Sequence, residues 1–436
     1  MIKKIDHFFR ITERGSTFKR EFAAGLVTGL SMMYIIAVNP AVLGTIGGIM
    51  EPDRVFTATI LVTVISTLLM GILARIPVAV SIGMGINAYF AFMVCGKLGF
   101  DPRVALAAVF LEGLIFFAVS ICGLRKAIIR AIPDNIKIGI AVSIGVFIAL
   151  VGLISGGVVV SHPATVVTLG DLTHGPALLT FIGLMITVIL HVNKVPGGII
   201  IAVILTTLIG IPMGVTNVPG NFNPFSMPAA PNLMQFDFSQ LFTGRFFMVV
   251  ITLGMVHFFD TVGTLSSVLS MAKLSDKNGN FPRIKEAYVS DSLAGVISAV
   301  FSVSPATAYV ESGVGVAAGA RTGFANIATA LLFLAALFLS PVFLIMPASA
   351  TAPALIFVGY LMMSEIIKVK FEDFSQGFPV YLGILACVFG YSITMGIIFS
   401  VVSYTVIKIF QGKAKEVPLG TYLLTVFFIL QFFLPK

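Results

Sequence analysis

Long hydrophobic runs separated by short polar intervals dominate this chain. Crossing a hydrocarbon core of about 30 Å takes roughly 17–25 apolar residues in a helix, and runs of about this length recur along the sequence. The pattern therefore predicts an all-α polytopic membrane protein with 14 transmembrane segments. We expect spans near residues 22–44, 55–75, 77–95, 102–123, 134–154, 175–192 and 196–212, and again near 245–270, 286–303, 305–319, 322–341, 349–367, 374–391 and 393–410.

Three further segments flank these spans. Residues 1–21 are basic and amphipathic, without the apolar centre of a cleavable signal, so we expect them at the cytoplasmic membrane surface. Residues 213–244 form a polar interval rich in Pro, Asn and Gly, which predicts an extramembrane loop. The C-terminal segment 411–436 contains another apolar run, which is either an interfacial helix or a fifteenth crossing.

Composition supports a membrane protein and weighs against a soluble domain, a nucleic-acid-binding protein and a disulfide-rich or metal-binding protein. The chain is 58% hydrophobic and 11% charged, whereas soluble domains carry about 25% charged residues. Its net charge of +8 comes from short clusters rather than a continuous basic face, so no nucleic-acid partner is expected. The three cysteines lack the spacing of a disulfide framework or metal site.

The basic clusters predict topology, because Lys and Arg concentrate in cytoplasmic loops. With a cytoplasmic N-terminus and the spans above, all the main clusters fall on one side. This predicts a multi-pass membrane protein in contact with lipid, and we expect it in the plasma membrane, which is the inner membrane in bacteria. The clusters are Lys3, Lys4, Arg10, Arg14, Lys19 and Arg20; Arg125, Lys126 and Arg130; Lys273, Lys277, Arg283 and Lys285; Lys368 and Lys370; and Lys413 and Lys415.

Two spans, the third and the tenth, are broken at matching positions. Pro77 and Pro305, and likewise Gly85 and Gly313, are separated by 228 residues. Each proline opens a short stretch that favours a strand, and each glycine lies where a half-helix is expected to start. Such a match predicts two repeats, 22–212 and 245–410. Because each holds seven spans, the second enters from the other side and the repeats are inverted.

Two strands related in this way run antiparallel, so we expect 77–82 and 305–310 to pair at the middle of the membrane. The half-helices then begin near residues 83–85 and 312–313. Their N-termini carry free N–H groups and partial positive charge, which favours acceptor-rich or anionic groups.

Two intramembrane acids are the leading candidates for substrate or proton binding. An acid at the centre of a span costs about 2.5–3.5 kcal/mol, so it is read first as functional. Asp260 in the eighth span either contacts substrate or is a structural acid, and Glu311 either contacts substrate or caps its half-helix. His257, three residues before Asp260, either tunes the protonation of Asp260 or packs as a structural histidine. Asn87 either reads a substrate edge or begins a helix.

Three other acids need an explanation. Asp291 and Glu365 are expected near span ends, in structural roles, whereas Glu112 lies deeper and is a candidate for coupling. The sequence has no phosphate-binding loop, and residues 83–88 lack the context of a dinucleotide fingerprint.

Four segments resemble the azaguanine-type purine permeases, a branch of the nucleobase:cation symporter-2 family. They are FAAGLVTGLSMMYIIAVNP (22–40), GMGINAYFAF (83–92), HFFDTVGTL (257–265) and AYVESGVGVAAGARTG (308–323). The resemblance implies a core of spans 1–4 and 8–11 and a gate of spans 5–7 and 12–14. It also implies import of adenine, guanine or hypoxanthine with protons. The family's eighth-span acid falls on Asp260, its tenth-span glutamate on Glu311, and its third-span G-x-N on Gly85 and Asn87.

We therefore expect a purine nucleobase:proton symporter without cofactors, working by alternating access. The expected substrate-binding residues are Asp260, Glu311, Asn87, Gly85, Ser312 and Gly313, and the expected proton-coupling residues are Asp260, Glu311 and His257. A homodimer is one assembly compatible with the sequence, which leaves the oligomeric state and the preferred purine open. The alternatives are an anion transporter or channel, and an intramembrane hydrolase using Asp260 and Glu311 as an acid pair. The two carboxylates weigh against the first, and the lack of a nucleophile motif weighs against the second.

Overall fold

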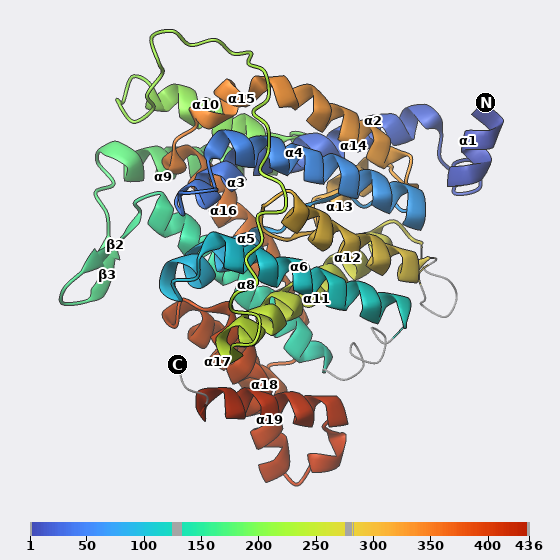
Figure 1. The fold of residues 1–436 in the computed structure, drawn as a ribbon, viewed down its shortest axis with the longest axis vertical. Coiled ribbons are helices and arrows are strands. Elements are labelled where there is room, and N and C mark those ends of the chain that lie inside the picture. Colours follow the sequence, from blue (N-terminus) through green and yellow to red (C-terminus); the bar gives the residue numbers. More distant parts are fainter. Residues whose placement is uncertain (1, 124–132, 275–280, 282, 434–436) are drawn as a thin grey trace.

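The computed structural model describes residues 2–123, 133–274, 281 and 283–433. It is mostly helical, and several of its long helices lie side by side across the molecule (Figure 1). Of the basic residues used to predict topology, Arg125, Lys126, Arg130 and Lys277 lie outside the described residues.

The first half follows the predicted order of spans. Prolines open several of its helices, as at Pro52 and Pro102, because the first helical position needs no N–H donor. The first span is interrupted at Met33–Tyr34, so it consists of two helices. The helices are α1 (Ile2–Phe9), α2 (Phe18–Met32), α3 (Ile35–Gly44), α4 (Pro52–Leu69, continued by a π-helical turn Met70–Ala74), α6 (Pro102–Ile121), α8 (Asp134–Ser155), α9 (Gly175–Val192) and α10 (Gly198–Gly210).

The second half repeats this series. Within the described residues, eight helical stretches are long and apolar enough to cross a membrane by length and composition, and the other spans are shorter or broken. The helices are α11 (Gly244–Met271), α12 (Ile284–Val300), α14 (Ala325–Ala336), α15 (Ser340–Leu344), α16 (Ala348–Met363, continued by a 3₁₀ turn Ser364–Lys368), α17 (Phe374–Phe389), α18 (Ile393–Phe410) and α19 (Leu419–Phe433).

The two broken spans pair as predicted. Strand β1 (Val80–Ile82) leads into α5 (Met84–Ala88), which continues as a π-helix to Lys97, and strand β4 (Ala306–Ala308) leads toward α13 (Ser312–Ala318). The strands are antiparallel, with Val80 opposite Ala308. These paired residues are themselves 228 positions apart (308 − 80), which is the repeat offset. The two-fold axis relating the repeats therefore passes between them.

A two-stranded sheet within a membrane must also satisfy its outer edges, because no water is available there. The Thr67 hydroxyl serves the edge of β1, donating to Val80 O over 2.9 Å and accepting from Val80 N over 3.0 Å. Asp291 serves the edge of β4, where its Oδ1 accepts from Ala308 N over 3.0 Å. The sequence-based expectation that Asp291 lies near a span end was wrong, because it is in the middle of α12 and 1% exposed.

Two features between spans were less predictable. A hairpin of strands β2 (Val159–His162) and β3 (Val166–Leu169) follows α8, in a stretch where the sequence indicated only a connection. The long loop before α11 runs over the molecule (Figure 1) and is held by hydrogen bonds, including Met234 N to Val300 O and Asp237 N to Arg103 O.

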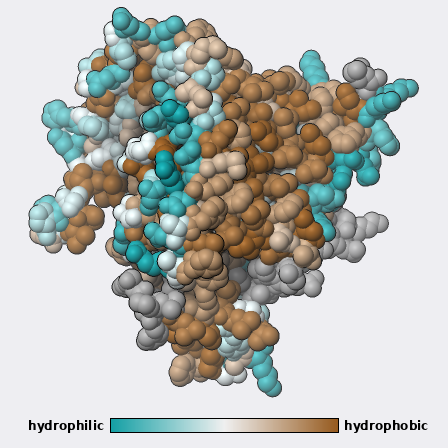
Figure 2. Space-filling model, in the orientation of Figure 1, coloured by the Kyte–Doolittle hydropathy of each residue, from teal (hydrophilic) through white to brown (hydrophobic). Residues whose placement is uncertain are grey.

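The surface is consistent with burial in lipid. Figure 2 shows a broad hydrophobic face over the long helices, with hydrophilic residues gathered toward their ends. Exposed apolar side chains continue onto α17 and α18, for example Phe389 and Phe410.

Candidate functional site

A cavity of about 640 Å³ lies where the broken spans meet the long helices α8, α11 and α16. Its inner end is formed by residues 83–85, residues 308–311 and Tyr34, and one wall is the face of α11 from Phe259 to Met271. Its outer end is lined by Asp134, Lys137, Glu365 and Lys368. Lys368 belongs to the basic residues expected on the cytoplasmic side, so this end of the cavity lies toward the side predicted to be cytoplasmic.

Asp260 projects from α11 into this cavity and is half-buried. Its carboxylate lies against the start of α5, because a Cβ atom placed on Gly83 would be 3.7 Å from Asp260 Oδ2. The first helical hydrogen bond of α5 is from Asn87 N to Gly83 O, so the N–H groups of residues 84–86 precede the helical ladder. The N-terminal end of α5 therefore favours negative charge and acceptor atoms beside Asp260.

Glu311 lies across the cavity as the N-cap residue of α13, and it is 5% exposed. Its Oε1 accepts a hydrogen bond from the Tyr34 hydroxyl over 2.6 Å. The N–H groups of Ser312 and Gly313 donate to Tyr309 O and Val310 O within the preceding turn. The two half-helices therefore differ. The N–H groups of Ser312 and Gly313, which were predicted to be free, already donate to backbone carbonyl groups.

Of the other residues that the sequence predicted to bind substrate, one lines the cavity and three do not. Gly85 lines the cavity, and a Cβ atom there would lie 2.5 Å from Cγ2 of Ile144 on α8. Asn87, Ser312 and Gly313 lie outside the lining. Asn87 Oδ1 accepts from the Ser304 hydroxyl over 3.0 Å, and Ser312 Oγ accepts from Ala79 N over 2.9 Å, so these two side chains tie the broken spans together.

His257 also lies away from the cavity, between two acids. Its Nδ1 is 2.9 Å from Glu112 Oε1 on α6, and its Nε2 is 3.2 Å from Asp291 Oδ2 on α12. All three side chains are at most 2% exposed. The Thr261 hydroxyl donates to Asp291 Oδ2 over 2.5 Å, which links this cluster to the residue next to Asp260.

Most of this chain matches a known protein family. Residues 19–403 match the model of a family described as "Permease family". The chain belongs to this family.

Relatives of this permease include transporters of named substrates. It is 41% identical over 438 residues to the guanine/hypoxanthine permease PbuG of Bacillus subtilis, covering 98% of this chain and 99% of PbuG. It is 35% identical over 431 residues to the adenine permease AdeP of Escherichia coli, covering 98% and 95%. Membership confirms the expectation of a multi-pass membrane transporter rather than an enzyme.

The fold of this permease is also that of a solved transporter domain. The transmembrane domain of the cyanobacterial bicarbonate transporter BicA superposes with a TM-score of 0.67, covering 88% of this chain and 97% of that one at 16% identity. The predicted fold class, 14 spans as 7+7 inverted repeats with broken spans 3 and 10, is confirmed.

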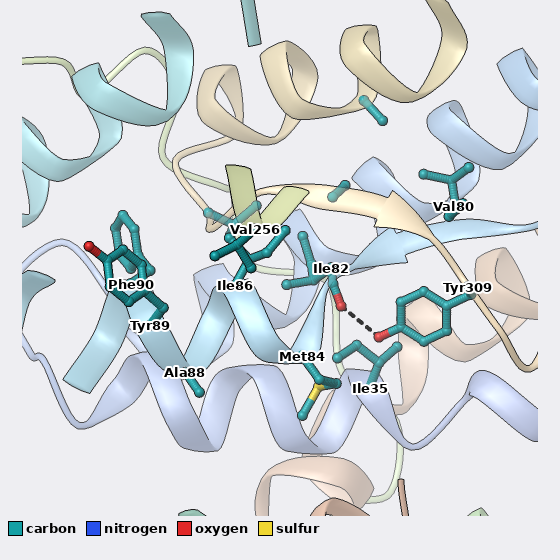
Figure 3. Close-up of a cluster of buried hydrophobic side chains, with 14 of the residues drawn as sticks. Ile35, Val80, Ile82, Met84, Ile86, Ala88, Tyr89, Phe90, Val256 and Tyr309 are labelled. Carbon is teal, nitrogen blue, oxygen red and sulfur yellow. Dashed lines mark hydrogen bonds between the residues drawn. The ribbon is translucent and has the colours of Figure 1, made fainter. Parts of the chain in front are cut away.

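The two tyrosines of the cavity were not singled out as candidates from the sequence of this permease. Tyr34 lies in segment 22–40 and Tyr309 in segment 308–323, both of which resemble the purine permeases. The Tyr309 hydroxyl donates to Ile82 O over 2.6 Å, joining the two broken spans (Figure 3). A hydroxyl within an apolar span was the available signal, but tyrosine packs so readily in membranes that it carries little weight alone.

The cavity combines apolar walls with acceptors at its inner end. Ile148, Phe259 and Val310 contribute hydrophobic surface, and Asp260 and Glu311 contribute carboxylates. In the described part of the chain, no three His, Cys, Asp or Glu side chains are arranged to hold a metal ion. Such a site suits a flat, mostly apolar molecule with N–H donors.

Proposed function

We propose that this permease imports purine nucleobases together with protons, by alternating access of the core spans against the gate spans. The observation that carries this proposal is the position of Asp260 and Glu311, which face one cavity beside the start of α5. Support also comes from relatives named for guanine, hypoxanthine and adenine that match nearly the whole chain.

A purine base presents both donors and acceptors on a flat ring. In the proposed complex, Asp260 and Glu311 accept from purine N–H groups, and the first N–H groups of α5 donate to ring acceptors. Gly85 has no side chain, so the backbone of α5 can approach the purine closely. Asn87 and Ser312 act from behind the cavity by holding the broken spans in place, and Gly313 belongs to the turn that opens α13.

The charge of the empty site supports the proposal of proton coupling. Two carboxylates in a cavity that must close within the membrane are costly, because a closed apolar environment disfavours ionised groups. Protonation of Asp260 or Glu311 lowers this cost before the core moves against the gate. In this proposal His257 influences coupling only through Asp291 and Thr261, since it does not reach the cavity.

Uptake measurements test the proposal. Radiolabelled adenine, guanine, hypoxanthine, xanthine and uracil are supplied to cells that lack their own nucleobase permeases, with and without a protonophore. We expect saturable uptake of a purine that collapses with the proton gradient and is lost in Asp260→Asn and Glu311→Gln.

Asp171→Asn is the matched control. Hydrogen bonds from Thr173 and His174 lower the pKa of Asp171 to about 2, so this variant removes a charge that is present throughout the assay. Asp171 is exposed and outside the cavity lining, and the variant should transport normally. Well-expressed protein that takes up no base would overturn the proposal, and uptake of labelled bicarbonate by that protein would favour the anion alternative.

A further inference from the structure

Tyr34 lies in the cavity and contacts Glu311, and no tyrosine among the described residues makes such a contact with Asp260. It lies at the break between α2 and α3, its side chain is fully buried, and it contributes to the cavity wall. Its hydroxyl donates to Glu311 Oε1 over 2.6 Å, from a position 277 residues earlier in the chain. The contact therefore joins the first span of one repeat to the broken span of the other.

Glu311 depends on the Tyr34 hydroxyl because its own half-helix, α13, offers its side chain few hydrogen-bond donors. As the N-cap residue of α13 it makes no side-chain cap hydrogen bond. The N–H groups of Ser312 and Gly313 already donate to carbonyl groups of the turn. Asp260, in contrast, lies beside the start of α5, where helical N–H groups precede the hydrogen-bond ladder.

We propose that Tyr34 is a positioning residue for the substrate: it holds Glu311 Oε1, so that Oε2 is the oxygen aimed at the purine. This inference rests on the proposed function. A hydrogen bond from a buried phenol fixes the carboxylate rotamer and supplies the stabilising donor that a buried charge requires. Without it, Glu311 must rotate or be ordered again each time substrate binds.

The second tyrosine of the cavity does a different task. The Tyr309 hydroxyl donates to a backbone carbonyl, Ile82 O, and so secures the pairing of the broken spans rather than a substrate ligand (Figure 3). Loss of the Tyr34 hydroxyl is therefore expected to affect binding, and loss of the Tyr309 hydroxyl the shape of the inner end.

The experiment compares three proteins with the wild type in the purine uptake assay, at matched membrane abundance. Tyr34→Phe removes the hydroxyl alone. Incorporation of 4-aminophenylalanine at position 34 restores an uncharged donor at the same reach. Tyr422→Phe is the matched control, because the Tyr422 hydroxyl donates to Ala414 O over 2.8 Å far from the cavity lining.

We expect Tyr34→Phe to raise KM for the purine about tenfold or more, as for loss of a hydrogen bond to a charged group, with maximal velocity changed less than about twofold. The 4-aminophenylalanine protein should recover most of the affinity, and Tyr422→Phe should match the wild type. An unchanged KM in folded Tyr34→Phe overturns the proposal. So does a raised KM that the restored donor fails to correct, which would indicate a packing role.

Failure of this inference and failure of the proposed function are distinguishable. If the wild type takes up no purine, the function itself is wrong. If the wild type takes up purine and Tyr34→Phe behaves like it, only the role of Tyr34 falls. Should Tyr34→Phe not reach the membrane, the wild type and the 4-aminophenylalanine protein are compared with 4-fluorophenylalanine at position 34, which keeps the ring and cannot donate.

Discussion

Asp260 and His257 lie three residues apart on α11, yet they belong to regions with opposite designs. His257 is enclosed by Glu112 and Asp291, and every member of that cluster is nearly inaccessible. Asp260 faces a cavity of about 640 Å³ that opens toward the side predicted to be cytoplasmic. One region pairs its charges with each other, and the other leaves its carboxylate facing space that a ligand can enter.

The contrast shows how a membrane protein separates support from function. A buried ion pair that loses one member leaves the other uncompensated, so the cluster around His257 resists change. Neutralising a carboxylate that faces a cavity strands no buried counter-charge of this kind, because water or substrate faces it instead. We therefore expect variants of the first region to lower stability and variants of the second to lower uptake.

The largest expected effect is on stability, from Asp291→Ala. This change removes the acceptor for Ala308 N and the Thr261 hydroxyl and a counter-charge of His257, so unfolding should become easier by about 3–5 kcal/mol. Thermal unfolding of purified protein measures the loss. Glu365→Ala, which breaks a partly exposed pair with Lys368, is the control and should cost less than about 1 kcal/mol. Equal stability of Asp291→Ala and wild type would refute a supporting role.

Asp260→Asn should instead lower uptake about 100-fold or more, because the carboxylate proposed to accept from substrate N–H groups loses its charge. Its thermal unfolding should stay close to that of the wild type, since the change leaves no hydrogen-bond partner of Asp260 unpaired in the part of the chain that the structure describes. A variant that unfolds early, as expected for Asp291→Ala, would show that Asp260 is a structural acid as well.

Gly85→Ala tests the cavity region without altering charge. The added methyl group would meet Ile144 Cγ2 on α8, and overpacking of this kind costs about 1–3 kcal/mol. We expect uptake to fall about tenfold, because the contact lies between the predicted core and gate. Gly85→Ala combined with Ile144→Leu removes the opposing methyl group and should recover uptake, and failure to recover would place the effect elsewhere.

Thr261→Val gives the smallest expected effect, at the link between the two regions. Removing one hydroxyl donor to Asp291 should cost about 1 kcal/mol of stability and reduce uptake only a few-fold. Thr252→Val, a buried threonine earlier on α11, is the control. Complete loss of uptake in stable Thr261→Val would mean that the His257 cluster takes part in coupling directly.

Much of this fold was accessible from residue patterns. Apolar runs place most spans to within a few residues, because lipid demands long hydrophobic helices wherever the chain crosses. The equal spacing of Pro77 and Gly85 from Pro305 and Gly313 led to the paired strands, since two broken backbones in a membrane must satisfy each other. The hairpin β2–β3 escaped prediction, because a short exposed ribbon lacks a comparable constraint.

The site was only partly accessible. The cost of an acid in a span singles out Asp260 and Glu311 from the sequence alone, and both line the cavity. The cost of placing an acid in a span could not predict that His257 and Asp291 face each other, or that Asn87 lies behind the cavity. These contacts depend on which side of each helix faces its neighbours. The contact of Tyr34 with Glu311 spans 277 residues and leaves no trace in local pattern.

Local chemistry thus selects the charged residues and the broken spans. Only the packing of the two repeats decides which charges are paired, which face the cavity and which donor holds Glu311, because those partners come from distant parts of the chain.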